Sequence, residues 1–308
     1  MKRKTSLLAA ITAVAATLAL VSTVQSYRFW KRRRLLRIGE TSKLLETALG
    51  PVEYSTWGQG PTVLVVHGSP GGYDQSLTFA KLIGSQRCSF IALSRPGYLQ
   101  TPLRVGQTPE QQADLYATLL DALGIERAAV IGISGGGPSS LQFALRYPER
   151  CRGLALISTV SGRYDEVELR RALPRVRRFF NQIYSKLITL DPLLYLLLPV
   201  ARMQPDHMIS AELLQSVMLY RLRKVGYEND MAQFAALSPY PLEQIAVPTF
   251  VVHGTGDTEV PFEHAKRLAS EIPNVKLLTI NNGKHLTFYT HSHIVMPELR
   301  TFLEGLED

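Results

Sequence analysis

Short apolar runs rich in β-branched residues alternate with longer segments of helical periodicity along most of the chain. The apolar runs predict buried strands at residues 63–67, 90–93, 129–133, 154–158, 249–253 and 276–280. Buried strands separated by helices are typical of a mostly parallel sheet covered by helices on both faces. Residues 52–57, followed by the turn-forming residues 58–61, predict an antiparallel edge strand.

One predicted helix has a clear start signal. Thr108 is a typical N-cap, Pro109 suits the first helical position, and Gln111 lies three positions after the cap. This spacing predicts a capping box, in which the side chains of the cap and of the third helical residue satisfy backbone N–H groups reciprocally.

A glycine-rich turn follows the strand predicted at residues 129–133. Ser134 lies there in a G-x-S-x-G pattern at residues 132–136, ahead of a helix predicted over residues 138–146. This context is typical of a nucleophile elbow, a sharp strand-to-helix turn that lifts a serine hydroxyl clear of the sheet. Gly132 and Gly136 keep Cβ atoms out of the crossing, and the helix N-terminus directs N–H groups at the reacting oxygen. The alternative is a glycine-rich loop with a capping serine.

A second glycine cluster, H-G-S-P-G-G at residues 67–72, follows the strand predicted at residues 63–67. It resembles the H-G-x-P-G loop of the α/β-hydrolase family. In that family, an N–H of this loop and the N–H after the nucleophile stabilise the oxyanion that forms during acyl transfer. The resemblance implies that Ser69 and Gly135 supply these N–H groups and that Ser134 is the nucleophile. We expect His67 to orient the loop and not to act as the base.

The resemblance also implies an acid and then a histidine after the nucleophile. The segment H-G-T-G-D-T-E-V-P at residues 253–261 is similar to the family's acid-bearing turn, which makes Asp257 the expected orienting acid. Glu259 and Asp230 are alternatives. His285 follows the strand predicted at residues 276–280 and matches the family's catalytic histidine. Neutral His285 is expected to accept the Ser134 proton while Asp257 fixes its tautomer.

The remaining histidines and the turn at residues 94–98 are not expected to take part in catalysis. The other histidines of the C-terminal part lie in helical segments and are interpreted as surface or packing residues; they are His264, His291 and His293. Residues 94–98 resemble the family's D-R-P-G-Y turn, with Ser94 in place of the usual Asp. That departure leaves open how this loop is anchored.

The domain organisation follows from the resemblance. We expect an N-terminal segment at residues 1–38, a hydrolase core at residues 39–161 and 240–308, and a helical cap at residues 162–239. The cap segment contains no clear strand pattern, and its leucine-rich residues 187–200 are interrupted by Pro192 and Pro199. These leucines form either the buried core of the cap or a surface that contacts an acyl chain or a membrane. The arginines at residues 163–178 are interpreted as a solvated helix face.

Basic residues are concentrated at the N-terminus. Nine lysines and arginines and no acid occur within residues 1–38, whereas the formal charge of the whole chain is +8. The remainder is therefore close to neutral and lacks the basic footprint of a nucleic-acid-binding protein. The basic residues flank an uncharged segment at residues 7–24, which would span about 27 Å as a helix. We expect a membrane anchor with the hydrolase on the cytoplasmic side; the alternative is a cleaved signal peptide and a secreted enzyme.

The chain contains two cysteines. Cys88 and Cys151 precede the fourth and sixth strands of the family's scheme, which the family's strand order separates by two others, so we expect no disulfide between them. No metal-ligand spacing, phosphate loop or dinucleotide fingerprint is present, so we predict neither a metal nor a cofactor.

Together, the motifs predict a membrane-anchored, carboxylesterase- or lipase-like serine hydrolase of the α/β-hydrolase fold. It is expected to cleave an ester, thioester or amide of a small-molecule or lipid-like acyl substrate through an acyl-enzyme. The loop at residues 67–72 also resembles that of proline iminopeptidases, so an aminopeptidase is the enzymatic alternative. A non-catalytic, membrane-tethered binding module of the same fold is the alternative from another class.

Overall fold

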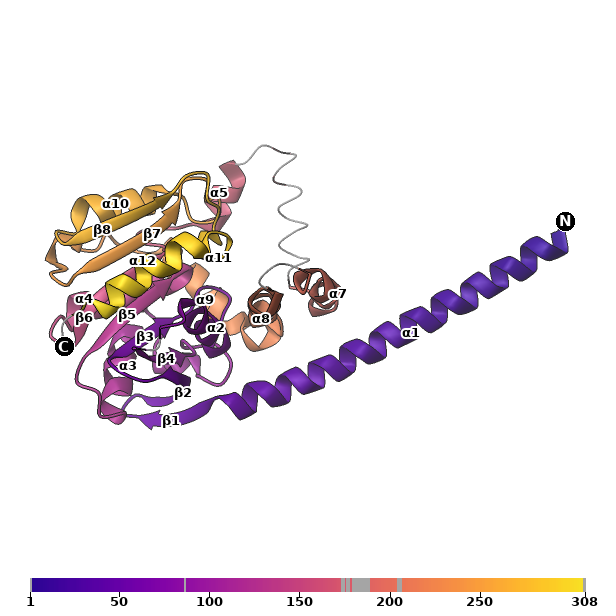
Figure 1. Ribbon diagram of the computed structural model, residues 1–308, viewed down its shortest axis with the longest axis horizontal. Coiled ribbons are helices and arrows are strands. Elements are labelled where there is room, and N and C mark those ends of the chain that lie inside the picture. Colours follow the sequence, from indigo (N-terminus) through magenta and orange to yellow (C-terminus); the bar gives the residue numbers. More distant parts are fainter. Residues whose placement is uncertain are drawn as a thin grey trace. The chain divides into compact units, whose positions relative to one another are not determined.

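The computed structural model describes residues 2–85, 87–172, 175, 178, 189–203 and 207–306. The chain divides into two compact units, Met1–Thr41 and Ser42–Asp308. The first unit is the helix α1 (Lys2–Thr41), shown in indigo in Figure 1. Within the described part of the chain, no helix combines the length and the apolar character that a membrane crossing needs. The anchor expected at residues 7–24 stays a prediction.

The second unit is built on an eight-stranded sheet with the strand order β1-β2-β4-β3-β5-β6-β7-β8 (Figure 1). The strands are β1 (Lys43–Thr47), β2 (Gly50–Gly58), β3 (Thr62–Val66), β4 (Ser89–Leu93), β5 (Ala128–Ile133), β6 (Cys151–Ile157), β7 (Thr249–Gly254) and β8 (Val275–Ile280). The strands from β3 to β8 pair in parallel, and the pairs β1–β2 and β2–β4 are antiparallel. The predicted mostly parallel sheet is confirmed.

The prediction of an edge strand at residues 52–57 is wrong in one respect. That segment belongs to β2, which is antiparallel as expected, but β1 pairs with its outer side from Lys43 opposite Tyr54 to Thr47 opposite Gly50. The sequence of β1 gave no signal because the strand is mostly solvent-exposed and so has no apolar run; Leu44, for example, is 56% exposed. The edge of the sheet is therefore the short strand β1.

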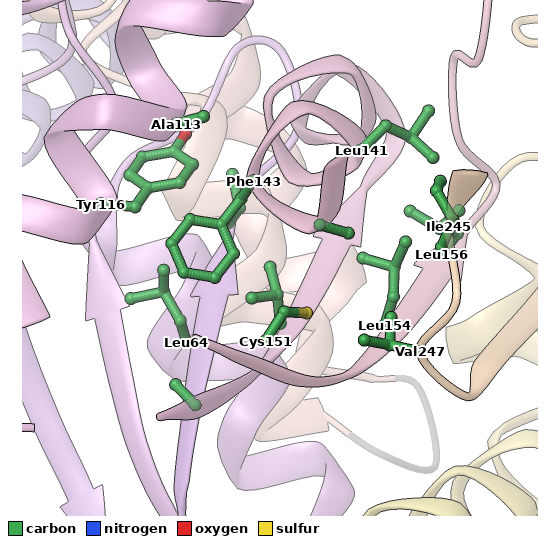
Figure 2. Close-up of a cluster of buried hydrophobic side chains, with 14 of the residues drawn as sticks. Leu64, Ala113, Tyr116, Leu141, Phe143, Cys151, Leu154, Leu156, Ile245 and Val247 are labelled. Atoms are coloured by element: carbon green, nitrogen blue, oxygen red, sulfur yellow. The ribbon is translucent and has the colours of Figure 1, made fainter. Parts of the chain in front are cut away.

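Alternate residues of the central strands pack against helices on opposite faces of the sheet. Leu64 and Val66 belong to the core that includes side chains of α3 (Pro109–Ala122), α4 (Gly137–Arg146) and α10 (Glu263–Glu271). Val63 and Val65 belong to the core formed with α2 (Tyr73–Ile83), α11 (Thr287–Thr290) and α12 (Ser292–Glu304). Figure 2 shows part of the first core, in which Phe143 of α4 lies between the labelled residues Leu64 and Tyr116. Burial on both faces explains why these strands have continuous apolar sequences.

Two local predictions are confirmed. Thr108 caps α3, because its Oγ1 accepts from the N–H of Gln111 at 3.3 Å while Gln111 Oε1 accepts from the N–H of Thr108 at 3.2 Å. Cys88 and Cys151 are both free and buried, and the strand order places β3 and β5 between β4 and β6.

The described residues between β6 and β7 include several helices and 3₁₀ turns. These are α5 (Glu166–Ala172), α7 (Asp191–Ala201), α8 (His207–Val217), the 3₁₀ turn η3 (Tyr220–Leu222), α9 (Lys224–Ala235) and the 3₁₀ turn η4 (Leu242–Gln244). We call the helices and turns from α5 to α9 the cap. Leu194 and Leu198 of α7 are buried, whereas Leu196 and Leu197 are about half exposed. Part of the predicted arginine-rich segment, residues 173–174 and 176–177, and the first two residues of the leucine-rich segment, 187–188, lie outside the described residues.

Candidate active site

Ser134 occupies a sharp turn between β5 and α4. Its φ angle is +49°, a left-handed backbone conformation that residues other than glycine rarely adopt. The 3₁₀ turn η2 (Ser134–Gly136) follows at once and leads into α4. A Cβ on Gly132 would lie 2.7 Å from Ser140 Oγ, and one on Gly136 would lie 2.5 Å from the Val66 carbonyl oxygen. The glycines of the motif are therefore required by close packing around the turn.

His285 lies between Ser134 and Asp257. Its Nδ1 is 2.8 Å from Asp257 Oδ2, and its Nε2 is 3.0 Å from Ser134 Oγ. The carboxylate can only accept, so Nδ1 carries the ring proton and Nε2 is free to accept the serine hydroxyl. The three residues come from the turn after β5 and from the loops that follow β7 and β8. The structure thus brings the three predicted residues together in hydrogen-bond contact.

The loop after β7 holds the carboxylate of Asp257 in place. Asp257 Oδ1 accepts from the N–H groups of Glu259 and Val260 at 2.9 and 3.0 Å. His253 Nε2 lies 3.3 Å from Asp257 Oδ2 and 3.0 Å from the carbonyl oxygen of Val260. Both of these partners are acceptors, so Nε2 of His253 carries a proton. His253, which sequence reasoning missed, is a second imidazole on the same carboxylate.

These contacts set the charges of the site. Burial opposes the ionisation of Asp257, but hydrogen bonds from His253 and His285 hold the pKa of its carboxyl well below the usual range. Burial also disfavours the imidazolium form of His285. The hydrogen bond to Asp257 and the negative charges of Glu259 and Asp257 outweigh that effect and raise the pKa of His285 above 6.5. The arrangement therefore pairs an ionised carboxylate with a histidine that is more basic than usual.

The two alternative acids do not take this position. Glu259 is exposed, and its Oε2 lies 4.0 Å from Nε2 of His285, the nitrogen that faces the serine. Asp230 is buried and is bound to Arg95, Tyr98 and Ser69. Asp257 is the carboxylate that contacts Nδ1 of His285.

The loop at residues 67–72, which we call the oxyanion loop, lies beside the serine. A Cβ on Gly68 would lie 3.1 Å from Ser134 Cβ, and one on Gly135 would overlap the Ser69 side chain. The two residues whose N–H groups were expected to bind the oxyanion, Ser69 and Gly135, are thus neighbours next to Ser134. Gly135 must be glycine for Ser69 to approach it.

Both ring nitrogens of His67 form hydrogen bonds with the backbone, one within the oxyanion loop and one with Arg95. Its Nε2 accepts from the N–H of Arg95 at 2.9 Å, so Nδ1 carries the proton and donates to the Gly68 carbonyl oxygen at 2.7 Å. Burial and the charge of Arg95 lower the pKa of His67 well below 6.5. A neutral histidine with both nitrogens occupied orients the loop, as the sequence suggested. His264 also has a packing role, because its Nδ1 lies 3.1 Å from the Ser161 N–H.

The replacement of the usual Asp by Ser94 is compensated from another strand. Ser94 Oγ donates to Glu53 Oε2 at 2.8 Å and accepts from the N–H of Tyr73, the first residue of α2, at 3.0 Å. Glu53 lies on β2 and is completely buried, and it also accepts from Gln100. A carboxylate is therefore present behind this loop, but it comes from a residue that the motif does not include.

Comparison with known proteins places this site in a family. The chain matches the alpha/beta hydrolase fold family over residues 61–195 and the TAP-like protein family over residues 231–307. It is similar to the uncharacterized hydrolase YcgS of Bacillus subtilis, with 31% identity over 77% of this chain and 89% of that protein. It is also similar to 2-hydroxy-6-oxononadienedioate/2-hydroxy-6-oxononatrienedioate hydrolase 2 of Pseudomonas putida. The identity is 27% over 78% of this chain and 87% of that protein.

A solved structure agrees with these matches. An alpha/beta hydrolase fold protein from Nakamurella multipartita shares 36% identity with this chain and a TM-score of 0.70, over 85% of this chain and 98% of that one. The sheet order, the family match and the share of each relative that this chain covers agree. The chain belongs to the α/β-hydrolase family, and it is a hydrolase.

Proposed function

We propose that the protein is a serine esterase that acts through an acyl-enzyme. The observation that carries this proposal is the continuous chain of contacts from Asp257 through His285 to Ser134 Oγ, 2.8 and 3.0 Å long. A base within hydrogen-bond reach of a hydroxyl, with a carboxylate behind it, is what activates a serine for nucleophilic attack. The oxyanion loop beside Ser134 provides the second requirement for acyl transfer, which is stabilisation of the developing negative charge.

The proposed reaction has two halves. Ser134 Oγ attacks the acyl carbon and transfers its proton to His285 Nε2, while the N–H groups of Ser69 and Gly135 bind the oxyanion. When the carbonyl reforms, the alcohol leaves with the proton from His285, and the acyl group stays on Ser134. A water molecule then repeats the sequence and releases the acid. Asp257 remains ionised throughout and stabilises the imidazolium that forms in each half.

The charges near the site favour an uncharged acyl group over the aminopeptidase alternative. An aminopeptidase must bind the ammonium group of its substrate, which calls for a carboxylate that lacks a strong cationic partner. Asp74 and Asp230, the buried carboxylates next to the oxyanion loop, are bound to Arg223 and Arg95 at 2.8 and 2.5 Å. Both are neutralised by arginine. Glu259, whose Oε2 lies 4.0 Å from Nε2 of His285, is exposed, so water screens its attraction for an ammonium group. We therefore infer an ester of an uncharged acyl group as the substrate.

A panel of p-nitrophenyl esters of increasing acyl length tests this proposal, with Ser134→Ala as the control. We expect Ser134-dependent hydrolysis with a preferred chain length. Amino-acid p-nitroanilides test the aminopeptidase alternative. One relative is named as a hydrolase of 2-hydroxy-6-oxononadienedioate, so that compound serves as a further comparison. Faster Ser134-dependent cleavage of either comparison substrate than of every ester would overturn the ester proposal.

We further propose that residues 7–24 anchor the chain in a membrane with the hydrolase on the cytoplasmic side. The support is the uncharged sequence between basic flanks, the more basic of which precedes the hydrolase. The full chain should remain in the membrane fraction after a carbonate wash. A chain that starts at Glu40 should be released and keep its esterase activity. Recovery of a mature chain that begins near Tyr27 outside the cytoplasm would show a cleaved signal peptide instead.

A further inference from the structure

We propose that Asp230, on the cap helix α9, is a positioning residue for the oxyanion hole, and that α9 thereby fixes the Ser69 N–H at the distance that catalysis needs. The inference rests on the proposed function, because it assigns to Asp230 an effect on the acyl-transfer site described above.

The contact between Asp230 and the oxyanion loop passes through the side chain of Ser69. Ser69 Oγ donates to Asp230 Oδ2 and accepts from Arg95 Nη2 at 2.9 Å. Arg95 also binds both carboxylate oxygens of Asp230, at 2.9 and 2.5 Å, and Tyr98 OH donates to Oδ2 at 2.5 Å. The Ser69 hydroxyl therefore has one donor and one acceptor partner, which fixes its direction and, with it, the backbone of residue 69.

The charged groups of the network are buried and hydrogen-bonded to one another. Arg95 and Asp230 are each only 1% exposed. A buried carboxylate that lost its donors would carry a large desolvation penalty, so the network has one strongly preferred arrangement. Arg95 also ties it to the loop backbone, because its Nε donates to the His67 carbonyl oxygen at 3.0 Å. The position of Ser69 is thus determined by α9 on one side and by the turn after β4 on the other.

The same cap segment binds the oxyanion loop at a second point. Arg223, directly before α9, donates from Nη1 to the Gly71 carbonyl oxygen at 2.6 Å and binds both carboxylate oxygens of Asp74 at 3.0 and 2.8 Å. Its Nε donates to the Met218 carbonyl oxygen at 2.8 Å. Arg223 is completely buried. The loop is therefore held by the cap at two points, Ser69 and Gly71.

Helical spacing explains how one segment reaches both oxyanion donors. Asp230 follows Arg223 by seven positions and Phe234 follows Asp230 by four, so the three residues lie on one face of the segment. Phe234 is buried, and its Cε2 would lie 3.2 Å from a Cβ on Gly135. Asp230 thus contacts the residue that carries one expected donor, and Phe234 packs against the residue that carries the other.

Two substitutions separate this role from a merely structural one. Ser69→Ala keeps the backbone N–H but removes the hydroxyl that connects it to Asp230. Asp230→Asn keeps the size of the side chain but turns an amide N–H toward groups that are themselves donors. The matched control is Ser85→Ala, because Ser85 Oγ likewise donates to a carboxylate (Glu304, 2.6 Å) and accepts from one N–H donor (Arg87, 3.1 Å). Ser85 has no contact with the oxyanion loop among the described residues.

The experiment measures kcat and KM on a p-nitrophenyl ester, together with the inhibition constant of an aryl trifluoromethyl ketone that forms a tetrahedral oxyanion with Ser134. We expect Ser69→Ala to lower kcat about 10-fold and Asp230→Asn about 100-fold, with KM changed less than about 3-fold. Binding of the ketone should weaken by the same factors as kcat/KM falls. The double variant should be no slower than Asp230→Asn, since both changes break one connection. Ser85→Ala should retain wild-type kcat.

The possible failures are distinguishable. A wild-type protein that neither hydrolyses the esters nor binds the ketone would overturn the proposed function, and this inference with it. A wild-type protein that does both, with Ser69→Ala unchanged in kcat and in ketone binding, would overturn the positioning role alone. If Asp230→Asn fails to fold, Ser69→Ala and its Ser85→Ala control decide the question by themselves.

Discussion

The strand ends of the sheet and the cap helix α9 contribute to one site in different ways. The turns and loops after β5, β7 and β8 carry Ser134, Asp257 and His285, whose side chains contact one another in series. Helix α9 carries Asp230, which contacts Ser69 of the loop that is expected to bind the oxyanion, together with Arg95 and Tyr98. The first region contributes the proposed chemistry and the second sets the geometry in which it operates. Changes in the two regions should therefore differ in size and in kind.

The largest effect is expected from the strand ends. Ser134→Ala and His285→Ala should each lower turnover by about 10⁴- to 10⁶-fold while the fold is retained, because each removes one member of a coupled unit. The double variant should lose little more than either single variant. Steady-state hydrolysis with circular dichroism as the folding control measures this. Additive losses would show that the two residues do not act together.

The acid can be tested with a matched pair of substitutions on one loop. Asp257→Asn should lower kcat by about 10⁴-fold, because an amide next to Nδ1 favours the wrong tautomer of His285. Glu259→Gln should change kcat little, since its carboxylate is exposed and 4.0 Å from Nε2. If Glu259→Gln had the larger effect, the acid would be misassigned.

A smaller effect, of a different kind, is expected in the cap. Arg223→Ala would leave Asp74 buried without its arginine, which should lower the free energy of unfolding by about 3–5 kcal/mol. Urea denaturation of the full chain measures this. Arg146→Ala is the control, because the ion pair of Arg146 with Asp114 is on the surface and is expected to contribute at most about 1 kcal/mol. Equal losses for the two variants would argue that the cap does not hold the loop.

The mildest test varies the pH. His285 must be neutral to accept a proton, and its pKa is raised above 6.5 by Asp257 and Glu259, although burial acts in the opposite direction. Thus kcat/KM should fall as the pH drops through a midpoint above 6.5, and Glu259→Gln should move that midpoint downward. A profile that stays flat to about pH 4, with the protein folded, would be incompatible with His285 as the base.

The same contrast explains what sequence could reveal. Ser134, Asp257 and His285 follow apolar strands in turns whose glycines are forced by close packing, so their surroundings leave a pattern in the sequence. Asp230 lies in a helix of mixed polar and apolar composition, so the sequence does not distinguish a buried aspartate there from a solvated one. The helix reads K-V-G-Y-E-N-D-M-A-Q-F-A. The partner that identifies it, Arg95, is 135 positions away. Polar networks between residues far apart in the chain leave no repeating pattern in the local sequence, so the sequence does not reveal them.

The departures from expectation have the same origin. Glu53 replaces the usual acid of the turn at residues 94–98 from a different strand, and β1 covers the predicted edge strand although most of its residues are exposed. In both cases, sheet pairing brings together residues that no motif connects. The strands, and the motifs that carry Ser134, Asp257 and His285, could be predicted because each depends on local sequence. Edge order and network partners depend on tertiary contacts.

The central claim is that His285 activates Ser134 as a nucleophile, and covalent labelling tests it most directly. A fluorophosphonate should add one label to the wild-type chain, located on Ser134 by peptide mass spectrometry. Labelling should be lost in Ser134→Ala and slowed by orders of magnitude in His285→Ala. A chain that stays unlabelled while folded, or that is labelled at the wild-type rate without His285, would contradict the account.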